Sequence, residues 1–154
     1  MKVAIQDKKS FTIAGIDMRT TNRNGEALLQ IPAFWQKFYH ENVIKKIPGA
    51  LHPEKVYALY SDYDEQGYYS MLLGVEIDGL HPLPEGIVAV TVPSSTYATM
   101  TAKGPISYAI TTACEYVWSH EFPHTRAFRG DFEVYDERSK AVRDAEVDLY
   151  ISIL

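Results

Sequence analysis

The chain has 154 residues, 46% of them apolar and 23% charged, which suits a soluble globular protein with one real core. Its 15 Lys and Arg against 20 Asp and Glu give a net charge of −5, so the basic surface that nucleic acid needs is missing. The longest apolar runs have only strand length and the N-terminus shows no signal segment, so we expect a cytoplasmic protein that does not enter a membrane. One cysteine, Cys114, rules out an internal disulfide and is expected to be a small core residue.

The first half of the chain predicts a strand, a helix and a hairpin. Apolar alternation over residues 11–18 changes phase at Gly15, which predicts a strand with a bulge at the glycine. Helical spacing follows and predicts a helix near residues 32–46. Two β-rich runs, 55–61 and 68–77, flank an acidic turn and predict a hairpin with a long loop. The residues at helical spacing are Ile31, Phe34, Trp35 and Phe38.

The second half predicts the same elements in the same order. Residues 86–92 and 96–102 predict a hairpin, and a helix is expected near residues 105–121. Residues 131–135 and 146–154 predict the closing strands, because apolar and polar side chains alternate along them. Each half therefore contains strand, helix, strand, strand, although the residues themselves do not repeat.

This order of elements predicts a single α+β domain over residues 1–154. Its two modules, roughly residues 1–80 and 81–154, would together form a mainly antiparallel sheet. The two principal helices would cover one face of that sheet.

Two metal-like motifs are better explained as ordinary structure. His120 and His124 match the H-E-x-x-H pattern of zinc proteases, but Pro123 between them ends a helix and so separates the two imidazoles. Residues 62–67 resemble the start of a calcium loop, yet Leu73 stands where a bidentate Glu is required. We therefore predict no metal site and no cofactor, with a solvated helix end and a hairpin loop in their place.

Glu133 is the carboxylate that best fits a binding site. Strand alternation places it on the same face as Asp131 and Tyr135, and opposite Phe132 and Val134. A strand glutamate ordinarily faces solvent. Here a pocket is favoured instead, because the chain has 11 tyrosines, roughly twice the usual share, which could surround the carboxylate. Aromatic walls around one carboxylate form a pocket that favours aromatic cations.

The order of these motifs resembles the GyrI-like small-molecule-binding domain. The closest resemblance is to the stand-alone effector-binding proteins of integron cassettes, which are related to the effector domains of AraC-type and multidrug-sensing regulators. The resemblance covers nearly the whole chain and implies a pocket between two duplicated modules. The segments that carry it are residues 31–38, 56–63, 69–75, 131–136 and 147–153.

The resemblance also implies a set of ligand-binding residues. Multidrug-binding members of the family use a buried strand glutamate to neutralise lipophilic cations, and Glu133 matches it. Trp35 matches the tryptophan of the first helix, and Tyr150 matches the aromatic residue of the last strand. The remaining aromatic candidates for the pocket wall are Tyr60, Tyr69, Tyr108 and Trp118.

Three function classes follow from the residues and the resemblance. The first is a protein that binds lipophilic aromatic or cationic compounds, for sensing or sequestration. The second is a hydrolase of strained cyclopropane-bearing alkylating compounds, in which Glu133 would be the catalytic carboxylate. The third is a protein-interaction module such as a gyrase inhibitor. Since no helix-turn-helix is evident, we expect no direct contact with nucleic acid, and any regulation would require a separate regulator chain.

Overall fold

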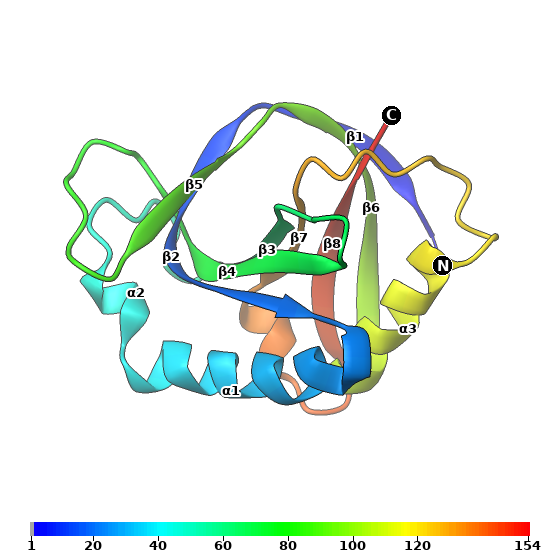
Figure 1. The fold of residues 1–154 in the computed structure, drawn as a ribbon, viewed down its shortest axis with the longest axis horizontal. Helices are drawn as coiled ribbons and strands as arrows, with labels where there is room; N and C mark the ends of the chain where they lie inside the picture. Colours follow the sequence, from blue (N-terminus) through cyan, green and yellow to red (C-terminus); the bar gives the residue numbers. More distant parts are fainter. Residues whose placement is uncertain (1) are drawn as a thin grey trace.

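One eight-stranded antiparallel sheet organises residues 2–154, which are the residues that the computed structural model describes. Figure 1 shows the sheet strongly curved, with the two principal helices on its outer face. The strands are β1 (Ala4–Lys8), β2 (Phe11–Thr21), β3 (Val56–Ser61), β4 (Tyr68–Ile77), β5 (Val88–Val92), β6 (Ser95–Gly104), β7 (Asp131–Tyr135) and β8 (Ala145–Ile153). The helices are α1 (Glu26–His40), α2 (Val43–Lys46) and α3 (Ile106–Trp118), with the 3-10 turns η1 (Arg23–Gly25) and η2 (Glu137–Lys140).

The strand order is β1-β6-β8-β7-β3-β4-β2-β5, and every neighbouring pair is antiparallel. The units β2-α1-β3-β4 and β6-α3-β7-β8 have the same element order and meet where β3 pairs with β7. The predicted α+β class, with a duplicated strand-helix-strand-strand module, is therefore confirmed.

The edge strands exchange between the two modules. β1 precedes the first module in the chain but pairs with β6 of the second, and β5 pairs with β2 of the first. The predicted hairpin over residues 86–92 and 96–102 is therefore wrong, because β5 and β6 lie at opposite sides of the sheet. The turn between them links the two modules and does not close a strand pair.

β2 contains no bulge at Gly15, contrary to the prediction. Its register with β4 runs without interruption from Thr12 opposite Ile77 to Thr21 opposite Tyr68. The apolar pattern changes phase because both faces of β2 are buried. Gly15 lies directly opposite Gly74, where an added Cβ would come within 1.9 Å of the Leu73 carbonyl oxygen, so the glycine permits a close approach of the two strands.

The first helix begins earlier and ends earlier than its predicted range of residues 32–46. It starts at Glu26, and Pro32 lies inside it instead of in its first turn. It ends at His40 because Asn42 adopts a left-handed backbone, with φ of 51°, before α2 begins. The second helix, α3, starts where predicted and ends three residues sooner, at Trp118. No helix within residues 2–154 has both the length and the apolar content to cross a membrane.

Three apolar clusters fill the two faces of the sheet. α1 packs Phe34 and Phe38 over the first module, and α3 packs Ala113 and Val117 over the second. Within residues 2–154, the opposite, concave face carries no helix and is filled by aromatic and aliphatic side chains from β2, β3, β4, β5, β6 and β7. Its members include Phe11, Ile13, Tyr57, Leu59, Leu72, Val92, Tyr97, Phe132 and Val134.

Candidate functional site

Glu133 is buried at the centre of the helix-covered face, with an exposed fraction of 4%. β7 carries it between β3 and β8, opposite Ala58 and Leu149. Its Oε1 accepts hydrogen bonds from the Tyr135 hydroxyl at 2.7 Å and the Tyr60 hydroxyl at 3.3 Å. Glu133 and Tyr135 therefore lie on the same face of the sheet, as the alternation along this strand predicted.

Burial raises the pKa of Glu133 to about 7, although both tyrosine hydrogen bonds act in the opposite direction. No Lys, Arg or His within residues 2–154 forms an ion pair with it. Burial also holds the pKa of Tyr60 and Tyr135 well above their usual range, so both phenols remain neutral donors. The protein therefore keeps a carboxylate in an apolar place without a positive partner, which is unfavourable unless a ligand supplies one.

Aromatic rings surround this carboxylate on two sides. On one side Trp35 of α1 packs edge-on against Tyr135 at 4.7 Å and stacks on Tyr39 at 6.0 Å. On the other side the Tyr60 ring lies 6.0 Å from that of Tyr69. Their flat faces present the negative charge density that attracts organic cations.

Cys114 of α3 lies close to the same carboxylate. Burial and, to a smaller extent, the nearby Glu133 together raise the pKa of its thiol to about 12. The cysteine therefore remains a thiol at neutral pH and acts as a packing residue beside Glu133. Its side chain is only partly exposed, so the expected small core residue lies at the edge of the core.

A cleft of about 350 Å³ opens beside Tyr135. Its walls are aromatic and aliphatic, and a carboxylate of Glu54 and the amine of Lys140 lie at its polar rim. Because Tyr135 both lines the cleft and donates to Glu133, a molecule in this cleft is separated from the carboxylate by one side chain. The lining residues are Trp35, Tyr39, Ile44, Pro53, Glu54, Val56, Ile106, Tyr135, Asp136, Ser139 and Lys140.

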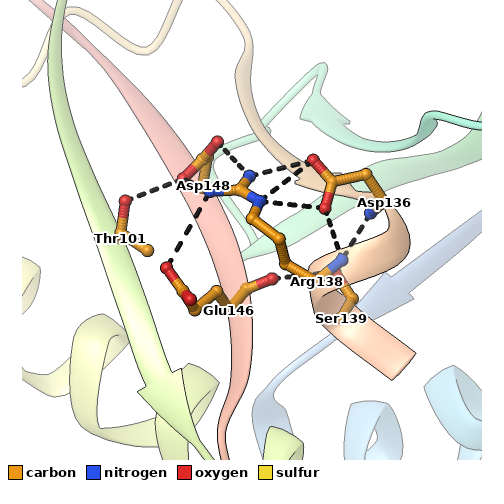
Figure 2. A network of polar contacts seen from close by, with 6 residues as sticks. All are labelled: Thr101, Asp136, Arg138, Ser139, Glu146 and Asp148. Carbon is orange, nitrogen blue, oxygen red and sulfur yellow. Dashed lines mark hydrogen bonds and ion pairs between the residues drawn. The ribbon is translucent and has the colours of Figure 1, made fainter. Parts of the chain in front are cut away.

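A polar network fixes one wall of the cleft (Figure 2). Asp136 caps η2 by accepting from the backbone N–H of Arg138 at 3.0 Å, and its backbone N–H donates to the Ser139 hydroxyl. Arg138 joins Asp136 at 2.9 Å to Asp148 of β8 at 2.5 Å. The Ser139 hydroxyl donates to the carbonyl oxygen of Glu146. These bonds hold η2 against β8, so the segment after Tyr135 is rigid.

The structure brings together four of the seven predicted site residues. Glu133, Tyr60 and Tyr69 form one buried group, and Trp35 joins it through Tyr135.

Tyr150, Tyr108 and Trp118 lie elsewhere. Tyr150 pairs with Phe132 in register and stacks on its ring at 4.5 Å, so it lies on the opposite face of the sheet from Glu133. Tyr108 is 68% exposed on α3. Trp118 is 66% exposed and covers the guanidinium of Arg126, so the structure groups none of these three with the carboxylate.

Two residues of the site, Tyr135 and Tyr39, were absent from the predicted set. Strand alternation alone places Tyr135 on the Glu133 face, so its role was visible in the sequence. Tyr39 follows Trp35 by four residues, which places both rings on one side of α1.

The two metal-like motifs lie after the end of α3 and in the loop between β3 and β4. α3 ends at Trp118, before His120, so the H-E-x-x-H segment is not helical. Asp64 accepts the backbone N–H groups of Gln66 and Tyr68, as a loop aspartate does. Within residues 2–154, no group of three or more His, Cys, Asp or Glu side chains is arranged to hold a metal ion.

Comparison with known proteins places this architecture in a family. The chain is 31% identical to the protein YobU of Bacillus subtilis over 153 residues, which is 96% of this chain and 93% of YobU. The solved structure of SAV2435 bound to tetraphenylphosphonium superposes with a TM-score of 0.82 at 21% identity, covering 100% of this chain and 94% of SAV2435. An integron cassette protein of Vibrio cholerae superposes with a TM-score of 0.72 at 28% identity, covering 99% and 95% of the two chains.

The profile of the Cass2 family matches residues 4–153, which is nearly the whole chain. Proteins of this family are described as effector binding proteins, so their general function is to bind small molecules. The chain belongs to the Cass2 family of integron-associated effector binding proteins.

Proposed function

We propose that this protein binds planar lipophilic cations in the aromatic cleft beside Tyr135, with Glu133 as the charge partner. The observation that carries the proposal is the buried Glu133 carboxylate, which has two neutral phenol donors and, among the described residues, no basic partner. A cation that enters the site restores the ionised form of the carboxylate and stacks on the surrounding rings. Sensing or sequestration of such compounds would follow from binding alone.

Two further observations support this ligand class. The cleft of about 350 Å³ has the size of a small aromatic molecule and mostly apolar walls. The similar protein SAV2435 was solved with tetraphenylphosphonium, a lipophilic cation that is not planar, and a lipophilic positive charge suits the carboxylate of Glu133 here.

The Glu133→Gln variant tests the proposal, because it keeps the shape of the side chain and removes its charge. We expect it to weaken binding of N-methylquinolinium by about 1–3 kcal/mol, because the charge attraction that is lost in this apolar site is comparable to that of a hydrogen bond to a charged group. Methylnaphthalene has the same shape without the charge, so its affinity should hardly change. Isothermal titration calorimetry with both compounds measures the difference.

Glu54→Gln provides the matched control, since it makes the same chemical change at the exposed rim of the same cleft. A screened rim charge contributes little, so this variant should bind both compounds as the parent protein does. Equal losses for the cation and for methylnaphthalene in Glu133→Gln would mean that Glu133 acts through packing.

A hydrolytic role for Glu133 is the second candidate, favoured by its pKa of about 7. A general base is most effective when its pKa lies near the working pH, and the Tyr60 and Tyr135 hydroxyls could stabilise a developing oxyanion. We expect a cyclopropane-bearing alkylating agent to be bound without turnover, as followed by mass spectrometry of the ring-opened product. Many turnovers per protein, lost in Glu133→Gln, would instead make the protein a hydrolase.

A further inference from the structure

β5 leaves one edge of the sheet open. It is the last strand in the sheet order, where it lies beside β2 and pairs with no other strand (Figure 1). Alternate residues of an antiparallel strand direct their backbone N–H and C=O groups to opposite sides, so part of these groups point away from β2. Within residues 2–154, β5 forms no backbone hydrogen bond other than those with β2. The outward groups therefore form an exposed row with which another strand can pair.

The segment around β5 carries no charge. Residues 86–102 contain no Asp, Glu, Lys, Arg or His, although charged residues make up 23% of the chain. β5 itself reads Val-Ala-Val-Thr-Val, and β-branched residues of this kind favour strands. Val88, Ala89 and Thr91 are exposed, so the rest of the described chain does not cover this strand.

β1, the strand at the other edge of the sheet, is protected against pairing. Asp7 and Lys8 lie on β1, and Lys9 follows it. Charged side chains, lysines above all, together with prolines and bulges, are the devices that keep natural sheet edges from pairing. β5 has none of them, because its register with β2 is unbroken and Pro93 comes after its end. The two edges thus differ in chemistry, and β5 is the one suited to take a further strand.

Two copies of β5 are complementary to each other in an antiparallel pair with a two-fold axis at Val90. β-branched residues would face one another along this pair, which stabilises a sheet, and no charge would meet a like charge. The nearest carboxylate is that of Glu85, and the two copies of it would lie at opposite ends of the pair. A closed dimer requires such a surface that is complementary to itself. The opposed residues would be Val88 with Val92, Ala89 with Thr91, and Val90 with its own copy.

We infer that this protein forms a two-fold dimer in which β5 pairs with β5 of a second copy. The two sheets then join into one continuous sheet. A strand of five residues buries less area than a permanent dimer needs, so the dimer is reversible, with a dissociation constant on the order of 100 μM. The strands β3, β4 and β2 separate β5 from β7, so this inference does not depend on the cation site at Glu133.

Sedimentation velocity at protein concentrations from about 10 μM to about 1 mM tests the inference, since this range spans the expected dissociation constant. The weight-average mass of the unaltered protein should rise from that of the monomer toward that of the dimer. Val90→Lys puts two positive charges opposite each other at the axis, and Val90→Glu puts two negative charges there. Each variant should associate at least about tenfold more weakly than the unaltered protein, because directly opposed like charges repel.

An equal mixture of Val90→Lys and Val90→Glu should recover the dimer, because opposite charges then face each other across the axis. Loss of the fold in either variant would not be repaired by mixing. Gln6→Lys is the matched control, since it adds the same charge at the exposed centre of β1 and should leave the association unchanged. Association that persists in Val90→Lys would overturn the inference, and so would association that is lost in Gln6→Lys, because β1 would then take part.

A second measurement uses the unaltered protein and covers the case in which the Val90 variants do not fold. Amide hydrogen exchange is compared at about 10 μM and at about 1 mM, below and above the expected dissociation constant. The outward amides of β5 should exchange more slowly at the higher concentration, whereas those of β1 should exchange at the same rate. Equal exchange of β5 at both concentrations, together with a mass that stays monomeric, would show that β5 is an unpaired edge and that no such dimer forms.

Discussion

Cation binding by this protein should weaken on the order of a hundredfold when the pH falls from about 8 to about 5. Glu133 has a pKa of about 7 in the empty protein, so it is mostly ionised at the higher pH and almost fully protonated at the lower one. A bound cation stabilises only the ionised form, and below the pKa each pH unit therefore lowers the apparent affinity about tenfold. The measurement is a series of calorimetric titrations with N-methylquinolinium, whose charge does not change over this range.

Two comparisons assign the pH dependence to Glu133. Binding of methylnaphthalene should not vary with pH, since it has no preference for the ionised carboxylate. Glu133→Gln should bind N-methylquinolinium weakly and equally at each pH, close to the affinity of the parent protein at about pH 5. A pH dependence that survives in Glu133→Gln would mean that a different group titrates.

The raised pKa of Glu133 also predicts how the free energy of unfolding of the empty protein changes with pH, which tests this pKa without any ligand. Glu133 has a folded-state pKa raised from 4.5 to about 7, so between these values the folded state binds more protons than the unfolded state. Its contribution to stability is therefore complete below pH 4.5 and is lost as the pH rises through 7. The free energy of unfolding of the parent protein should thus fall over this window relative to that of Glu133→Gln. A saturating cation should reduce the loss.

Much of the fold could be predicted from the sequence because the period of the apolar pattern changes where the elements change. β3, β4, β7 and α3 lie close to their expected ranges for this reason. The pairing of β5 could not be predicted, since the chain turns sharply between β5 and β6 and the sequence gives no sign that each pairs elsewhere. Likewise, the phase change at Gly15 results from a strand buried on both faces, which alternation alone does not distinguish from a bulge.

The sequence predicts which side chains share a face when they lie on the same strand. It does not do so when they lie on different strands, because the answer then depends on the register between those strands. Glu133 and Tyr135 share a face by simple alternation, whereas the face of Tyr150 depends on its pairing with Phe132. On α3, the buried residues include Val117, and Trp118 follows it by about 100° around the helix, so its exposure was implied by the apolar stripe.

The largest effect on stability is expected at Phe132, on the concave face. This ring is 1% exposed and has four aromatic neighbours, with Phe11 at 5.3 Å, Tyr57 at 5.7 Å, Tyr97 at 5.4 Å and Tyr150 at 4.5 Å between ring centres. Phe132→Ala would remove the centre of this cluster and leave a cavity that curved, hydrogen-bonded strands cannot close. We expect a loss of about 3–5 kcal/mol in the free energy of unfolding, measured by urea denaturation.

Tyr108→Ala is the matched control, because it also truncates an aromatic ring but at a position that is 68% exposed. Its effect should stay within about 0.5 kcal/mol. Since Phe132 faces away from Glu133, the folded fraction of Phe132→Ala should still bind N-methylquinolinium with an affinity close to that of the parent protein. A small loss of stability would show that the concave face can repack. Loss of cation binding in the folded variant would show instead that the two faces of the sheet are coupled, and that the aromatic core supports the Glu133 site directly.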